Sequence, residues 1–243
     1  MIEIPTTNGP VEALLARPDD DPHPGVLFFM NAAGLRPALQ QMADRIASWG
    51  YVVLVPNVLY RHGRAAEVTP RVDMSTEDGR KALFDKAGPA MRALTPGLFA
   101  DDLPAYLDAL RDNGAAPGPV GVTGYCFGAQ LAIRAACLDQ NVKAAAGFHG
   151  GNLATEEPDS PHLGLPNARA EFVFGHADDD PSMPPEQVTR LGEALTAAGL
   201  RHTNEVYDGT RHGYTMPDSP IYDENASERH FKLLQDLFAR TLH

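Results

Sequence analysis

The chain has 243 residues, of which 43% are hydrophobic, and carries a formal net charge of −12. That length can bury one sizeable core, and an acidic surface disfavours nucleic acid and anionic membranes as partners. The N-terminus has no basic segment followed by an apolar block, and no apolar run approaches the roughly 18 residues of a membrane helix. We therefore predict a soluble, cytoplasmic protein and, because no coiled-coil pattern is present, a monomer.

The first 56 residues predict a hairpin followed by a crossover unit. Residues 1–17 alternate around the turn signal Asn8-Gly9, which is typical of two antiparallel strands. After a polar loop, GVLFFM (25–30) and YVVLVP (51–56) are apolar runs of strand length. The segment between them, 38–50, has helical periodicity and ends at a glycine. Strand, helix and strand in this order indicate parallel pairing.

The remainder of the chain continues the alternation of strands and helices. Residues 61–100 carry scattered Arg, Asp, Gly and Pro and give the weakest pattern. We therefore predict a mainly parallel α/β sheet covered on both faces, in a single domain spanning 1–243. The predicted helices are 77–86, 88–93, 101–114, 127–138, 184–199 and 225–243, and the predicted strands are 119–125, 142–150, 170–175 and 202–209.

The stretch VTGYCFGAQ places Cys126 between Gly124 and Gly128, after a predicted strand and before a predicted helix. This G-x-nucleophile-x-G pattern is typical of a nucleophile elbow. There the sulfur would stand at the positive end of a helix, which favours the thiolate. The alternative is a small buried cysteine on a tight turn. Cys137, the other cysteine, falls inside the predicted helix and is expected only to pack.

A thiol nucleophile needs a base, and nine histidines compete for that role. His212 lies in YDGTRHGYTM, after the last predicted strand and before the last helix, where a base can reach the carboxyl edge of the sheet. His149 begins HGG, as in an oxyanion loop, but that loop should precede the nucleophile. We expect His149 either to line the pocket or only to pack. His230 and His243 are poorly placed.

The acid should follow the strand that ends at Gly175. The next segment, HADDDPSMPPE, offers Asp178, Asp179 and Asp180, any of which could orient the imidazole. The pattern alone does not choose among them.

At GYCFG, at DPSMPPE and at GTRHGYTMPD the chain resembles the dienelactone hydrolase family of α/β-hydrolases. The resemblance extends from about residue 8 to 240. It implies an α/β-hydrolase fold without a large cap domain and a Cys-His-Asp triad, with Cys126 as nucleophile and His212 as base. The family spacing Asp-x-x-x-Pro favours Asp180 as the acid, whereas counting from Gly175 favours Asp178; of the two, we predict Asp180.

The resemblance also implies the remaining members of the site. The oxyanion hole would consist of the backbone N–H groups of Phe127 and Ala32. At the end of the first core strand the family enzyme has a glutamate that activates the thiol, and Asn31 stands there in this chain. Arg61 is our candidate for anchoring a substrate carboxylate. Asn31, Arg61 and His149 are thus the predicted substrate-binding residues.

The leading prediction is hydrolysis of a small ester or lactone through a thioester, with neither metal nor cofactor, since no CxxC or HExxH spacing is present. Because asparagine cannot take a proton, a second hypothesis is a non-catalytic binding or redox-sensing module in which Cys126 is an oxidisable thiol. A Cys126–Cys137 redox pair is disfavoured, because the predicted helix keeps the two apart.

Overall fold

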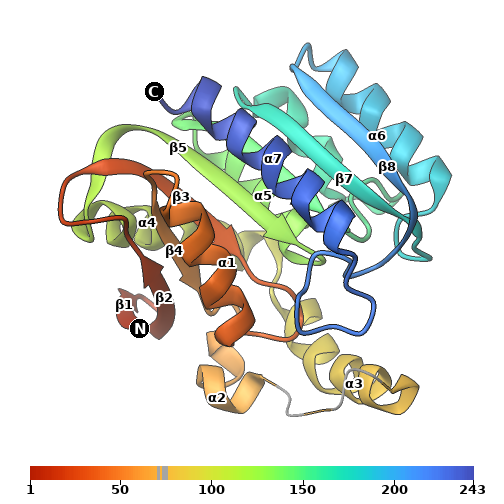
Figure 1. Cartoon of the computed structure of the whole chain (residues 1–243), viewed down its shortest axis with the longest axis horizontal. Helices are drawn as coiled ribbons and strands as arrows, with labels where there is room; N and C mark the ends of the chain where they lie inside the picture. Colours follow the sequence, from red (N-terminus) through yellow and green to blue (C-terminus); the bar gives the residue numbers. More distant parts are fainter. Residues whose placement is uncertain (70–71, 73–75) are drawn as a thin grey trace. The chain divides into compact units, whose positions relative to one another are not determined.

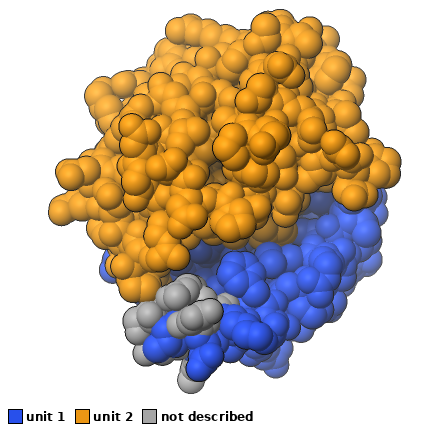
Figure 2. Space-filling view, turned by 90° about the vertical axis from the view of Figure 1, so that its right-hand side faces the viewer, with its two compact units in different colours: residues 1–117 blue, residues 118–243 orange. Residues whose placement is uncertain are grey.

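A computed structural model describes residues 1–69, 72 and 76–243 of the chain. They divide into two compact units, Met1–Pro117 and Gly118–His243, shown in different colours in Figure 2. The predicted α/β class is confirmed: the eight strands form a mainly parallel sheet with an N-terminal antiparallel hairpin. The single domain over 1–243 stays a prediction.

The strands of the first unit run in the order β1-β2-β4-β3. The first two form the predicted hairpin, with Thr6 opposite Gly9, which has a φ of 119° that glycine adopts readily. Strand β2 pairs antiparallel with β4, and β4 pairs parallel with β3. All five residues of β4 are buried, as a continuous apolar run predicts. These strands are β1 (Ile2–Thr6), β2 (Gly9–Ala16), β3 (His23–Phe29) and β4 (Val52–Pro56).

Helices cover both faces of these strands. Helix α1 packs against β2 and β4, and α4 packs against β1, β3 and β4 (Figure 1). Thr95 caps α4 by accepting a hydrogen bond from the N–H of Leu98, and Pro96 occupies its first turn. The helical segments of this unit are α1 (Pro37–Ala47), η1 (Tyr60–His62), α2 (Ala65–Val68), α3 (Glu77–Ala93) and α4 (Pro96–Asp112).

The second unit contains four strands in the order β5-β6-β7-β8, and every pair in it is parallel. Tyr125 lies opposite Phe148, and Phe148 lies opposite Gly175, so the strands are in register near their carboxyl ends. The strands are β5 (Ala115–Tyr125), whose first residues precede the unit boundary, β6 (Val142–Phe148), β7 (Glu171–Asp179) and β8 (His202–Arg211).

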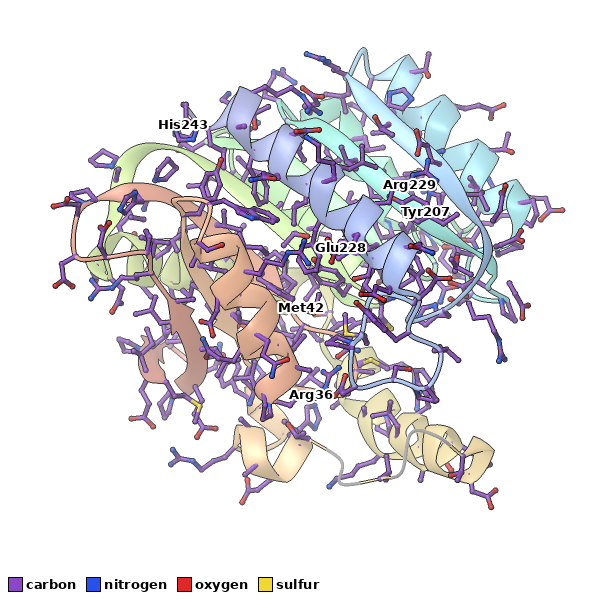
Figure 3. The ribbon with its side chains drawn as sticks, in the orientation of Figure 1. Arg36, Met42, Tyr207, Glu228, Arg229 and His243 are labelled. Carbon is purple, nitrogen blue, oxygen red and sulfur yellow. The ribbon has the colours of Figure 1, made fainter. Side chains whose placement is uncertain are left out.

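Helix α7 lies in front of these strands in Figure 1, and α5 lies behind them. Phe238 of α7 packs where a side chain on Gly121 would stand. Arg229 of α7 lies over the ring of Tyr207 in β8, with its guanidinium carbon 4.3 Å from the ring centroid (Figure 3). The helical segments are α5 (Gly128–Leu138), η2 (Pro161–Asn167), α6 (Pro185–Ala197) and α7 (Glu224–Thr241).

The structure corrects several predicted boundaries; β5, for example, begins at Ala115 rather than at residue 119, and β6 ends at Phe148 rather than at residue 150. Instead of two short helices, α3 continues from Glu77 to Ala93 through Pro89. Helix α4 begins at Pro96 rather than at Asp101, because Thr95 caps it. Strand β7 does not end at Gly175 but continues to Asp179, with a bulge between Ala177 and Asp179. Within the described residues, no helix is long and apolar enough to cross a membrane.

Candidate active site

Four functional candidates each stand immediately after a strand of the second unit. Cys126 follows β5, His149 follows β6, Asp180 follows β7 and His212 follows β8. Because the four strands are parallel and adjacent, their carboxyl ends meet at one edge of the sheet. The strand pairing alone therefore brings these side chains to a common edge.

The turn at Cys126 has the strained geometry that the sequence predicts. Cys126 has a φ of 57°, in the left-handed region that side-chain-bearing residues rarely adopt. Its N–H donates to the carbonyl of Phe148 at 3.1 Å, which fixes the turn to β6. A side chain on Gly124 would overlap the backbone of Gly128, so the first glycine of the motif is sterically required. The sulfur is thereby held at the start of α5, where backbone N–H groups favour an anion.

His212 contacts both the thiol and an aspartate. Its Nδ1 lies 2.6 Å from Oδ2 of Asp180, and a side-chain hydrogen bond also links it to Cys126. The Asp180 side chain is 1% exposed, whereas that of His212 is 24% exposed. The structure therefore places Cys126, His212 and Asp180 in one continuous chain of contacts.

The electrostatics of these three groups favour a charged imidazole. Burial opposes protonation of His212, but the neighbouring Cys126 and Asp180 outweigh it and raise the pKa of His212 to about 10. Burial would also raise the pKa of Asp180, yet hydrogen bonds from His212 and Ser182 hold it below its usual range. The raised pKa of His212 and the lowered pKa of Asp180 both favour an ionised carboxylate beside a protonated ring.

The other two aspartates of the acidic segment lie elsewhere. Because β7 continues to Asp179, both Asp178 and Asp179 are still on the strand, and both are exposed. Asp178 accepts a hydrogen bond from the N–H of Gly209, and Asp179 pairs with Arg211 at 3.4 Å. Asp180, the first residue past the strand, is the one of the three that contacts His212.

His149 lies beside His212, with 5.3 Å between the ring centroids. It is fully buried, has a φ of 38°, and its Nε2 lies 2.8 Å from Oγ1 of Thr215. In the same loop, Tyr214 donates to the carbonyl of Gly175 at 3.1 Å. These two bonds attach the His212 loop to β6 and β7. A substrate-binding role for His149 stays a prediction.

Three candidates belong to the first unit. The Oδ1 of Asn31 accepts a hydrogen bond from Nη1 of Arg36 at 2.8 Å, and Ala32 is buried. The guanidinium of Arg61 forms two hydrogen bonds with Asp102, at 2.7 and 2.8 Å. The roles predicted for Asn31, Ala32 and Arg61 stay predictions.

The sequence analysis did not identify two residues that lie at the site. Ser182 contacts both Asp180 and His212, and Thr215 contacts His149. The segment Asp180-Pro181-Ser182 could have indicated a turn in which Asp180 accepts the N–H of Ser182, at 2.9 Å. No comparable signal marks Thr215. Across the described part of the chain, no group of three or more His, Cys, Asp or Glu could hold a metal ion.

The second cysteine differs from Cys126 in its surroundings. Cys137 lies near the end of α5, partly buried, and burial raises the pKa of its thiol to about 12. A thiol of that kind stays protonated and unreactive at neutral pH. The two cysteines therefore provide a reactive candidate and an internal control in one chain.

The mainly parallel sheet with its N-terminal antiparallel hairpin is the fold of an α/β-hydrolase. A family model described as the dienelactone hydrolase family matches residues 11–242, and the chain belongs to that family. It is thus an ester or lactone hydrolase, as the sequence predicts.

Similar proteins agree with this assignment. The carboxymethylenebutenolidase of Rhodococcus opacus is 25% identical over 217 residues, which cover 87% of this chain and 79% of the relative. A Synechocystis protein, named by inference as a carboxymethylenebutenolidase, is 26% identical and covers 100% of this chain and 96% of its own. Among solved structures, a dienelactone hydrolase-like promiscuous phosphotriesterase from metagenomic libraries has a TM-score of 0.76 at 21% identity, covering 100% and 98% of the two chains.

Proposed function

We propose that the chain hydrolyses a small ester or lactone through a thioester on Cys126, with His212 as the base and Asp180 as the orienting acid. The observation that carries the proposal is the continuous contact from Cys126 through His212 to Asp180 at the carboxyl edge of β5, β7 and β8. A nucleophile, a base and a group that orients the base are the three parts that covalent acyl transfer requires.

In the first half of the proposed reaction, the thiol proton of Cys126 moves to Nε2 of His212, because Nδ1 faces Asp180. The sulfur attacks the carbonyl carbon, and the resulting oxyanion accepts a hydrogen bond from the N–H of Phe127 at the start of α5. The tetrahedral intermediate then breaks its C–O bond. The departing alkoxide or enolate takes the proton from His212 and leaves an acyl thioester.

In the second half, a water molecule gives one proton to Nε2 of His212 while its oxygen attacks the thioester carbonyl. The C–S bond breaks, the sulfur leaves as a thiolate, and the carboxylic acid is released. Throughout, the Asp180 carboxylate accepts a hydrogen bond from the Nδ1–H of His212 and stabilises the charged ring. This agrees with the raised pKa of His212.

The chemistry of sulfur favours esters over amides. In the tetrahedral intermediate of an amide, the thiolate is the better leaving group and would be expelled, whereas an enolate or another stable alkoxide leaves readily. The name of the Rhodococcus opacus relative denotes action on a carboxymethylenebutenolide, a lactone, which supports the same substrate class for this chain. The contact between Asp180 and His212 also favours catalysis over redox sensing, since a sensing thiol needs no acid behind its base.

The test uses p-nitrophenyl acetate and the two cysteines of the chain. Wild type and Cys137→Ser should turn over, while Cys126→Ala and His212→Ala should lose activity by roughly 10³-fold or more. Brief reaction followed by acid quenching and peptide mass spectrometry should find the acetyl group on Cys126. Turnover by Cys126→Ala at the wild-type rate would overturn the proposal.

A further inference from the structure

The hydroxyl of Ser182 touches two members of the proposed triad at once. Its Oγ lies 2.6 Å from Oδ1 of Asp180 and 3.4 Å from Nδ1 of His212. Its backbone N–H donates to the same Oδ1 at 2.9 Å. Asp180 thus receives two hydrogen bonds from Ser182 on one oxygen and one from His212 on the other.

The distances decide which of the two groups the hydroxyl acts on. At 2.6 Å the hydroxyl donates to the Asp180 carboxylate, and that distance is typical of a strong O–H···O⁻ bond. The Nδ1–H of His212 donates to Oδ2 of Asp180, also at 2.6 Å, so the 3.4 Å approach to Ser182 is a marginal contact. Ser182 therefore acts on the imidazole through Asp180.

The position of Ser182 is itself fixed by the segment after β6. The N–H of Asn152, which has a φ of 55°, donates to the carbonyl of Ser182 at 2.7 Å. A side chain on Gly151 would overlap the Ser182 hydroxyl, and the Gly151 carbonyl accepts from Nε2 of Gln130 in α5 at 2.9 Å. The backbone that leaves β6 is thus shaped to leave room for this hydroxyl.

We propose that Ser182 is a positioning residue, which holds the Asp180 carboxylate so that Oδ2 faces the Nδ1–H of His212. Without the hydroxyl, Oδ1 keeps the backbone N–H of Ser182 as its one hydrogen-bond donor among the residues described, and the carboxylate can turn away from the ring. This inference rests on the proposed function, in which Asp180 orients His212.

The experiment compares Ser182→Ala with Ser182→Thr and with a matched serine outside the site. Ser160 serves as the match because its buried hydroxyl also contacts a histidine, Nδ1 of His162 at 2.8 Å, in the same unit. With p-nitrophenyl acetate, Ser182→Ala should lower kcat by roughly 10-fold to 100-fold and leave KM within about twofold, since a hydrogen bond to a charged group is lost. Ser182→Thr should restore kcat to within about threefold of wild type, and Ser160→Ala should keep the wild-type kcat.

The outcomes separate this inference from the proposed function. Wild-type kcat in Ser182→Ala, while Asp180→Asn is inactive, overturns the role of Ser182 alone. Equal loss of kcat in Ser182→Ala and Ser160→Ala also overturns it, because the effect would then be structural. If Ser182→Ala does not fold, Ser182→Cys fills the same space with a weak donor and should show the same fall in kcat. Wild-type turnover by Cys126→Ala would instead defeat the proposed function.

Discussion

Among the described residues, each unit of the molecule buries one aspartate, and the two differ in their partners. The side chains of Asp102 in the first unit and Asp180 in the second are both 1% exposed. Asp102 accepts two hydrogen bonds from Arg61 and one from the hydroxyl of Tyr60, at 2.9 Å. Asp180 accepts from His212 and from Ser182. Both carboxylates are compensated, as burial of a charge requires.

The partner decides what each carboxylate can do. A guanidinium keeps its charge at every pH the protein meets, so the Arg61–Asp102 pair cannot take part in proton transfer. An imidazole, unlike a guanidinium, can give up and take back a proton, so the charge beside Asp180 can change during a reaction. His212 also contacts the Cys126 thiol, whereas the guanidinium of Arg61 is bound by Asp102 and stacked 4.6 Å from the ring centroid of Tyr60. A buried aspartate is therefore paired with a permanent charge in the first unit, whereas in the second unit its partner can transfer a proton.

The largest expected effect comes from removing the charge of Asp180. Asp180→Asn keeps the size of the side chain but presents an amide that no longer stabilises the charged imidazole of His212. We expect kcat for p-nitrophenyl acetate to fall by roughly 10³-fold to 10⁴-fold. Asp178→Asn is the matched control, because that carboxylate is exposed and accepts a hydrogen bond from the N–H of Gly209, away from His212. Full activity in Asp180→Asn would remove the distinction between the two aspartates.

Much of the fold and the turn at Cys126 could be predicted, because local patterns determine them. Apolar runs bounded by glycine or proline mark the strands, and Gly124-Tyr125-Cys126-Phe127-Gly128 after such a run marks the elbow. His212 could be placed because it follows the last strand. The start of α4 was also present in the sequence as Thr95-Pro96, a cap followed by a proline.

The features that could not be predicted depend on three-dimensional geometry. The sequence does not indicate that β7 continues past Gly175, so that Asp178 and Asp179 still lie on the strand. Arg61 and Asp102 are 41 residues apart, so nothing local indicates their pairing. The contact of Ser182 with Asp180 and His212 requires that the loops after β7 and β8 lie together.

The next largest effect should come from the structural aspartate. Asp102→Asn leaves the guanidinium of Arg61, which is 19% exposed, beside a neutral amide. Breaking a buried ion pair in this way should lower the free energy of unfolding by about 3 kcal/mol, measured by urea denaturation. The kcat of the folded protein should stay within about threefold of wild type. A loss of kcat comparable to that of Asp180→Asn would mean that Asp102 also serves the reaction.

The two pairs should also differ in their response to pH. The pKa of His212 is raised from its ordinary value near 6.5 to about 10, so the stability that its charged form adds is complete below about pH 6.5 and is lost as the pH rises through about 10. The difference in unfolding free energy between wild type and His212→Gln should therefore shrink from pH 7 to pH 10. The difference between wild type and Asp102→Asn should stay constant over that range, because Arg61 keeps its charge. Parallel pH profiles for the two differences would contradict the comparison.

The smallest expected effect concerns a buried polar group that lacks such a partner. The hydroxyl of Tyr207 is buried without a hydrogen-bond partner among the described residues, although its ring lies 5.2 Å from that of Tyr214. If pairing is what makes burial of Asp102 and Asp180 tolerable, then removing this hydroxyl should cost nothing. Tyr207→Phe should leave the unfolding free energy unchanged or raise it by up to about 1 kcal/mol. Tyr214→Phe is the matched change, and it should lower that free energy by about 1 kcal/mol, since it removes the bond to the carbonyl of Gly175. A larger loss in Tyr207→Phe than in Tyr214→Phe would show that partners seen in the structure do not determine which buried polar groups stabilise this fold.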